Sequence, residues 1–95
     1  MIVKGTTSGS IRSVAIDIAG TLTAFTLYNK SGGAIVANVG VGITGSYEYK
    51  MFNFNLAAAG TASSSVYQET NLTIPVGAQI ILVTSDSTDY VIQID

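Results

Sequence analysis

The chain has 95 residues, of which 47% are hydrophobic and only 11% are charged, and it contains no cysteine and no histidine. This length corresponds to one domain. Without these two residue types the chain lacks the thiol nucleophile, the imidazole base and the usual zinc ligands, so the composition predicts a protein that is not an enzyme and has no cofactor. The net charge of −2 leaves too few cations to neutralise the phosphates of a nucleic acid.

Two long uncharged stretches, residues 31–47 and 51–68, raise the question of a membrane protein. Both are crowded with Gly, Ser, Thr and Asn, whereas a spanning helix needs about 20 predominantly apolar residues. The first ten residues contain no apolar core of a secretory signal. The sequence therefore favours a soluble protein without a membrane partner.

Alternating apolar residues and frequent Thr, Val and Ile predict β-strands through most of the chain. The pattern places strands at residues 11–18, 22–29, 34–41, 46–56, 66–74, 78–84 and 90–94. In the third of these, Ile35, Ala37, Val39 and Val41 share one face. The nearly continuous apolar run at residues 78–84 is typical of a central strand that is buried on both faces.

The segments between these strands are typical of turns. Residues 30–33 contain paired glycines, Pro75-Val76-Gly77 combines a fixed φ with a glycine that tolerates positive φ, and residues 85–89 are polar. The small residues 57–65 predict a mobile loop. Short strands with turns at this spacing predict an all-β fold, an antiparallel β-sandwich or jelly roll of seven or eight short strands.

Residues 11–95 are expected to form the single sandwich domain. Residues 1–10 are rich in Gly, Thr and Ser and carry two apolar side chains near their tip, Ile2 and Val3. This composition suggests an extended N-terminal arm that reaches a neighbouring subunit. Ile2 and Val3 are the candidate assembly residues of this arm.

Two local motifs have a plain structural interpretation. Residues 40–45 match the spacing of a dinucleotide-binding glycine fingerprint, but a strand pattern follows where the fingerprint requires a helix. Asp86 and Asp89 offer oxygen ligands to a hard cation such as calcium, yet Asp and Ser in this arrangement more often stabilise a turn through side-chain hydrogen bonds. The sequence leaves open whether these two carboxylates hold an ion.

The aromatic residues are the most informative remaining feature, because five of them fall within residues 47–67, and their phase changes midway through the strand at 46–56. Such a change suggests a bulge or a strand that passes between sheets. Three roles stay open for this cluster: core packing, a protein interface and a platform that stacks on sugars. The candidate interface or ligand surface consists of Tyr47, Tyr49, Met51 and Tyr67.

Physical size also favours self-association. Burying apolar surface contributes about 135 kcal/mol to folding, while ordering the chain costs about 140 kcal/mol. These opposing terms cancel, and no disulfide is available to add stability. A surface poor in charge also resists association weakly. A homo-oligomer is therefore expected.

Two segments of the chain are residues 26–36, TLYNKSGGAIV, and residues 72–85, LTIPVGAQIILVTS. Together they resemble small β-sandwich virion proteins of tailed bacteriophages, namely head-decoration, head-fibre and tail-associated modules. The resemblance implies a structural role in the virion, contacts with other virion proteins, a homo-oligomer that is often a trimer, and no catalytic residues. Such a protein would be made in the host cytoplasm and reside in the particle. A carbohydrate- or receptor-binding module that recognises a host-surface glycan through the exposed tyrosines is the alternative.

Overall fold

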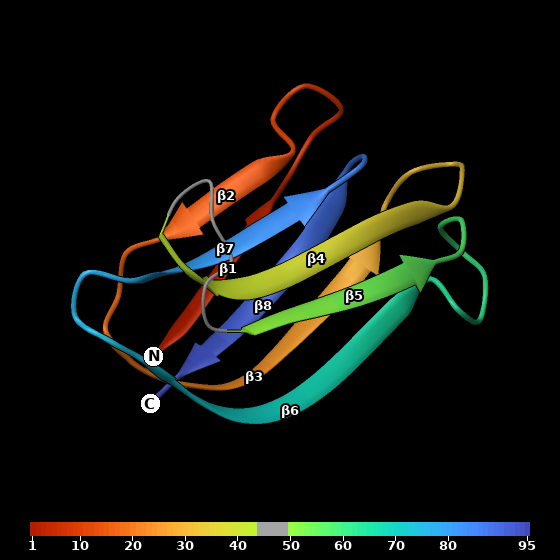
Figure 1. Cartoon of the computed structure of the whole chain (residues 1–95). Helices are drawn as coiled ribbons and strands as arrows, with labels where there is room; N and C mark the ends of the chain where they lie inside the picture. The colour runs from red at the N-terminus through yellow and green to blue at the C-terminus, as the bar shows by residue number, and fades with distance from the viewer. Residues whose placement is uncertain (44–49) are drawn as a thin grey trace.

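The computed structural model describes residues 1–43 and 50–95 and confirms the all-β prediction (Figure 1). The described residues form eight strands and no helix. The strands are β1 (Ile2–Thr6), β2 (Ser13–Ile16), β3 (Gly20–Asn29), β4 (Ile35–Gly42), β5 (Lys50–Leu56), β6 (Ser65–Ile74), β7 (Gln79–Thr84) and β8 (Thr88–Ile94).

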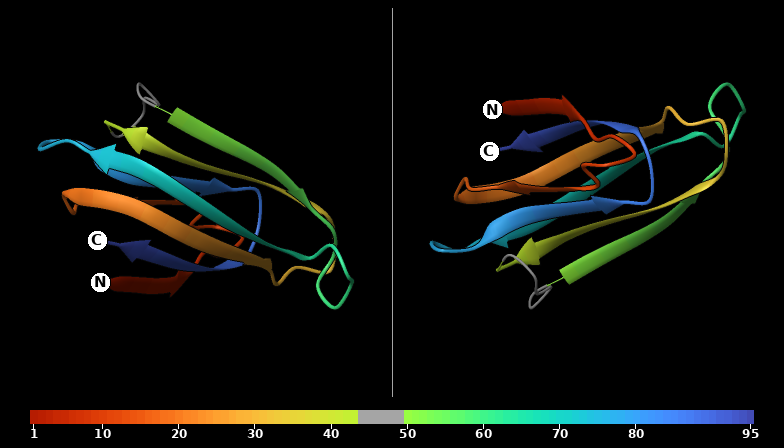
Figure 2. Two further views of the ribbon diagram at one scale, coloured as in Figure 1. Left: turned by 90° about the horizontal axis from the view of Figure 1, so that it is seen from below. Right: turned by 90° about the horizontal axis from the view of Figure 1, so that it is seen from above.

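The strands make two antiparallel sheets that pack face to face (Figure 2). Sheet A has the order β1-β8-β3-β6, and sheet B has the order β2-β7-β4-β5. The first strand therefore pairs with the last, the second with the seventh, the third with the sixth and the fourth with the fifth. This nested pairing is the jelly-roll form of the sandwich.

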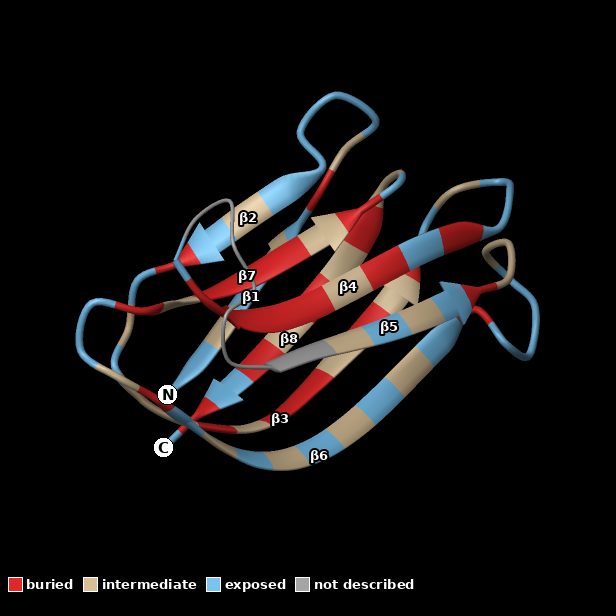
Figure 3. Ribbon diagram, in the orientation of Figure 1, coloured by how far each residue is buried: buried red, intermediate tan, exposed pale blue. Residues whose placement is uncertain are grey.

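The core lies between the two sheets and follows the alternation of the sequence (Figure 3). β4 buries Ile35, Ala37, Val39 and Val41, as predicted. The ring of Phe25 from sheet A meets the rings of Phe52 and Phe54 from sheet B edge to face, with centroids 5.5 Å and 5.8 Å apart. Such contacts stabilise a pair of aromatic rings beyond the area that they bury.

β7 is a central strand of sheet B, and its side chains are buried on both faces, as the apolar run predicted. The first predicted strand is shorter than expected, because Ile11 lies in a turn where its N–H donates to Ser8 Oγ at 2.9 Å. β3 also departs from simple alternation. A bulge between Leu22 and Ala24 shifts its register against both neighbouring strands, so Leu22 and Phe25, which are three positions apart, both lie in the core.

The N-terminal segment is a strand of the domain instead of an arm that extends from it. β1 pairs with β8 from Ile2 opposite Gln93 to Thr6 opposite Asp89. The terminal amino group donates to the carbonyl of Ile94 at 2.7 Å. The segment joins the sheet because β8 would otherwise present an unpaired edge and because the side chain of Val3 packs against the core. The ordered domain therefore begins at β1, before residue 11.

Two predicted turns are formed as expected. The N–H of Ala78 donates to the carbonyl of Pro75 at 3.0 Å, and Gly77 between them has a φ of +88°. The turn at residues 30–33 is fastened by Asn29, which is fully buried. Asn29 Nδ2 donates to the carbonyls of Gly33 and Ala57 at 2.8 Å, and Asn29 Oδ1 accepts from the N–H and the hydroxyl of Ser31 at 2.8 Å.

Two other predictions fall partly outside the described residues. Gly40 and Gly42 of the glycine-rich motif lie in strand β4, and the described part of the motif forms no helix, as the strand pattern predicted. In β5, Phe52 and Phe54 pack against the core and Leu56 is buried. The change of phase predicted for the aromatic strand involves residues 46–49, which lie outside the described ranges.

Candidate functional site

The outer face of sheet A is the candidate site, because it carries the one predicted tyrosine whose side chain is described. Antiparallel register aligns its side chains in rows across the four strands. One row runs Lys4, Val91, Thr26 and Tyr67, and the next runs Thr6, Asp89, Tyr28 and Ser65. The outer face therefore carries charged, polar and apolar side chains side by side, with a tyrosine in each of two adjacent rows.

The structure separates the predicted site residues. Tyr67 lies on the outer face of β6 and is 56% exposed, and Ile2 lies on the outer face of β1 and is 59% exposed. The two residues are thus on one face but at opposite edges of sheet A. Val3 points to the other side and packs against the core. Tyr47, Tyr49 and the side chain of Met51 lie outside what the structure describes.

The two edge strands of sheet A each have one backbone edge that pairs with no other strand in the described part of the chain. Along an antiparallel strand, the backbone N–H and C=O groups of one residue bond to the strand on one side, and those of the next residue point to the other side. Met1 and Ile94 exchange both backbone bonds, and Thr7 N donates to Thr88 O at 2.9 Å. The odd-numbered residues of β1 therefore bond to β8, and the N–H and C=O groups of Ile2, Lys4 and Thr6 point outward.

The backbone groups of β6 alternate in the same way. The N–H of Asn29 donates to the carbonyl of Ser64 at 2.8 Å, so the even-numbered residues at the start of β6 bond to β3. The N–H and C=O groups of Ser65, Tyr67 and Glu69 then point away from the sheet. In agreement, the carbonyl of Glu69 accepts from the side chain of Gln68 at 2.8 Å.

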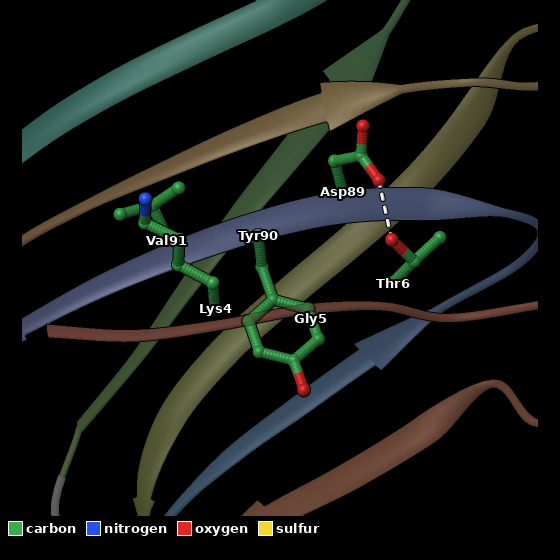
Figure 4. A pocket seen from close by; sticks show the side chains of 6 residues that line it. All are labelled: Lys4, Gly5, Thr6, Asp89, Tyr90 and Val91. Carbon is green, nitrogen blue, oxygen red and sulfur yellow. Dashed lines mark hydrogen bonds between the residues drawn. The ribbon is translucent and has the colours of Figure 1, made fainter.

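A shallow depression of about 360 Å³ lies at the β1 edge (Figure 4). It is lined by Lys4, Gly5, Thr6, Asp89, Tyr90 and Val91. Figure 4 shows the ring of Tyr90 on one side of the ribbons and the side chains of Thr6 and Asp89 on the other. Thr6 Oγ1 donates to Asp89 Oδ1 at 2.5 Å, and Lys30 Nζ lies 3.8 Å from Asp89 Oδ2.

The two carboxylates considered for an ion are each used by the protein. Asp86 Oδ1 accepts from the N–H of Ser87 at 2.7 Å, which is the turn role that the sequence favoured. Asp89 is held by Thr6 and Lys30. Within residues 1–43 and 50–95, no group of three or more His, Cys, Asp or Glu residues is placed to hold a metal ion.

Three buried threonines form a network that the sequence interpretation missed. The hydroxyls of Thr7, Thr84 and Thr88 converge on the carbonyl of Asp86 at 3.1, 2.8 and 2.9 Å. Thr7 Oγ1 also accepts from the N–H of Thr88 at 2.9 Å. The network links the end of β1 to the β7–β8 turn and so fixes the end of the outer face. Thr84 and Thr88 flank that turn in the sequence, but nothing local indicates Thr7 as their partner.

Sequence reasoning also missed the residues at the β1 edge that line the depression. The sequence carries little signal for them, because residues 2–6, IVKGT, do not alternate strictly between apolar and polar side chains.

The described residues contain no helix with the length and apolarity needed to cross a bilayer. No protein-family model matches the chain, and no curated protein matches it either.

Proposed function

We propose that this protein is a non-enzymatic structural protein of a virion, a capsid-decoration, head-fibre or tail-associated module. It acts through protein–protein contacts in a symmetric homo-oligomer, with a trimer as the favoured state, and contacts other virion proteins. The observation that carries the proposal is the outer face of sheet A, where exposed Ile2 and Tyr67 lie beside two unpaired strand edges.

The remaining surface supports this proposal. Large apolar side chains are exposed at several places on a chain with only ten charged residues, namely Met1, Ile2, Ile11, Val36, Ile43, Tyr67 and Val76. Few like charges oppose the approach of two copies. In a closed assembly, each copy covers part of this apolar surface of its neighbour, which stabilises the folded state by mass action.

Multi-angle light scattering after size exclusion tests the oligomer. The chain has a mass of 9.8 kDa, so the eluted peak of a trimer should have a measured molar mass three times that of the chain. A protein that stays monomeric at high concentration contradicts the proposal. Mass spectrometry of purified virions from the source of the sequence tests the location, and the expected result is a component present in many copies per particle.

The second candidate is a carbohydrate- or receptor-binding module. Tyr67 is 56% exposed and lies opposite Thr26 on the neighbouring strand β3. Tyr28 lies two residues beyond Thr26 on the same face of β3, so the two tyrosines occupy adjacent rows of the outer face. Aromatic faces of this kind stack on sugar rings. A glycan array with the wild-type protein and with Tyr67→Ala, Tyr47→Ala and Tyr49→Ala separates the candidates. Loss of sugar binding by a variant that keeps the oligomeric mass favours this second function.

A further inference from the structure

We infer that the outer edge of β6 in one copy pairs with the outer edge of β1 in the next copy, so that sheet A continues head to tail around the oligomer. This inference rests on the homo-oligomer proposed above and names the surfaces that form it. Four features of the described residues lead to it: strand direction, the parity of the backbone groups, charge and shape.

Strand direction permits the junction. Every neighbouring pair in sheet A is antiparallel, so the four strands in the order β1-β8-β3-β6 alternate in direction. β6 therefore runs opposite to β1. A second copy in the same orientation places its β1 antiparallel to β6 of the first copy. Copies related by rotation about an axis that runs roughly along the strands can thus extend one antiparallel sheet, and such a head-to-tail contact closes into a ring when the rotation closes.

The backbone groups on the two edges have matching parity. On β1 they belong to Ile2, Lys4 and Thr6, and on β6 to Ser65, Tyr67 and Glu69, by the alternation established above. All six residues direct their side chains to the outer face of sheet A. Pairing Lys4 with Glu69 and Thr6 with Tyr67 therefore joins the outward backbone groups of both edges and keeps each side chain on its own face. The carbonyl of Glu69, which accepts from Gln68 Nε2, has a second lone pair for the N–H of Lys4. Tyr67 and Glu69 come before Thr70 and Asn71 in β6, the two residues that lie opposite the bulge of β3, so the proposed pairing does not include them.

Charge selects this junction over the two symmetric ones. Lys4 is the charged residue of β1, and Glu69 is the charged residue of β6. The structure gives neither of them a salt bridge within the described residues, where Lys30 and Asp89 form the one ion pair. In a two-fold junction between the β6 strands of two copies that overlap over most of their length, the two Glu69 side chains come together. In a two-fold junction between two β1 strands, the two Lys4 side chains come together. Like charges on adjacent strands are destabilising, whereas opposite charges across strands are favourable.

Shape agrees with the same register. The depression at the β1 edge is lined by Lys4, Gly5, Thr6, Asp89, Tyr90 and Val91, and the side chains of Lys4, Thr6, Asp89 and Val91 lie on the side away from the Tyr90 ring (Figure 4). The proposed register places Tyr67 of the next copy beside these four side chains. Tyr67 projects from the opposite edge of sheet A and is mostly exposed. A tyrosine that enters a hollow in a neighbouring surface is a typical anchor of a protein interface.

Charge reversal tests the inference. We expect Lys4→Glu and Glu69→Lys each to raise the dissociation constant of the oligomer about tenfold or more, because each variant places like charges in contact. The double variant Lys4→Glu/Glu69→Lys restores the opposite charges and should return the constant to within about threefold of wild type. Arg12→Glu and Asp17→Lys make the same charge changes on residues outside the two edge strands and should leave the oligomer unchanged. Light scattering across a dilution series measures all six proteins.

Cysteine crosslinking provides an independent test that does not alter the charge pair. The natural chain has no cysteine, so introduced thiols react only with each other. In the proposed register, Thr6 and Tyr67 of adjacent copies have Cα atoms about 5.5 Å apart, which suits a disulfide. Mild oxidation of an equimolar mixture of Thr6→Cys and Tyr67→Cys should yield a crosslinked dimer. Neither variant alone should crosslink, nor should Thr6→Cys mixed with Asn55→Cys, whose thiol lies on exposed β5 of sheet B.

The outcomes separate this inference from the proposed function. An oligomeric wild type whose mass is insensitive to both charge reversals, or a Tyr67→Cys protein that crosslinks by itself, overturns the β6–β1 junction and leaves the homo-oligomer in place. A monomeric wild type overturns the homo-oligomer itself. Circular dichroism of each variant verifies the fold, and if a charge-reversed variant is unfolded, the crosslinking result decides the matter.

Discussion

The phenol ring of Tyr90 lies over the backbone of Gly5, its partner on the neighbouring strand. The two residues are directly opposite each other in the β1–β8 pair, and the ring occupies the space that a Cβ on Gly5 would fill. A glycine in a strand often marks such a close approach, and an aromatic side chain on the neighbouring strand compensates for the missing packing. This contact fastens the edge strand that carries Lys4 and Thr6.

The first prediction concerns this contact. Gly5→Ala should lower the free energy of unfolding by about 1–3 kcal/mol, because the new methyl group overlaps the ring and forces the strand or the ring to move. Urea denaturation at a fixed protein concentration measures the loss. In a Tyr90→Phe background the same substitution should cost less, because the hydroxyl oxygen is the atom nearest to the new methyl group. Gly33→Ala is the matched control, because nothing lies within 4 Å of a Cβ there. Equal losses for the two alanine variants would refute the overlap.

The second prediction concerns Asn29, which joins the β3–β4 turn to the β5–β6 loop. Asn29→Ala should lower the free energy of unfolding by about 2–4 kcal/mol, because it removes four hydrogen bonds made by a fully buried side chain, two of which hold the carbonyls of Gly33 and Ala57. Asn55→Ala removes an exposed amide on β5 and should change stability by less than about 0.5 kcal/mol. A loss at Asn29 no larger than that at Asn55 would contradict the role of the buried amide.

The third prediction concerns the threonine network. Thr84→Val keeps the shape of the side chain but removes a hydroxyl that bonds to Thr7 at 2.9 Å and to the carbonyl of Asp86 at 2.8 Å. We expect a loss of about 1–2 kcal/mol in the free energy of unfolding, seen as a lower midpoint in urea with an unchanged slope. Thr73→Val, on the exposed face of β6, is the control and should have little effect. If the two variants have the same midpoint, the network does not stabilise the turn.

The fourth prediction separates backbone strain from packing. Gly77 has a φ of +88° with open space where a Cβ would lie, so Gly77→Ala should cost about 1–2 kcal/mol through strain alone. Gly32→Ala, at an open position without positive φ, should be near neutral or slightly stabilising, because alanine lowers the entropy of the unfolded chain. Thermal denaturation of both variants checks the difference, and a neutral Gly77→Ala would show that the turn relaxes without cost.

Local chemistry accounts for the features that were predictable. Alternation placed Ile35, Ala37, Val39 and Val41 on one buried face, and the apolar run in β7 indicated a central strand. Pro75 and Gly77 indicated their turn because fixed and positive φ values are properties of single residues. The exposure of Tyr67 on an outer face also follows from alternation along β6. These signals act over a few residues, so the sequence carries them directly.

Other relationships depend on segments that are distant in the chain. Composition suggested an arm for residues 1–10, yet β1 pairs with β8. Neither segment has a local sequence feature that indicates the other as its partner. Thr7 meets Thr84 across 77 positions, and Gly5 meets Tyr90 in the same way. Pairing of this kind depends on how all the strands compete for a place against the common core and for backbone partners. The alternation of side chains within one strand contains no information about that competition.

By itself, therefore, the amino-acid sequence determined the β class, the buried faces and the turns, because these follow from side-chain alternation and from the φ preferences of individual residues. Only the tertiary structure decided that the first and last strands pair, that Lys4 and Glu69 lie at opposite edges of one sheet, and that Tyr90 covers Gly5. The physical reason is that a backbone edge bonds to any strand of suitable direction, so the choice of neighbour is a property of the whole fold.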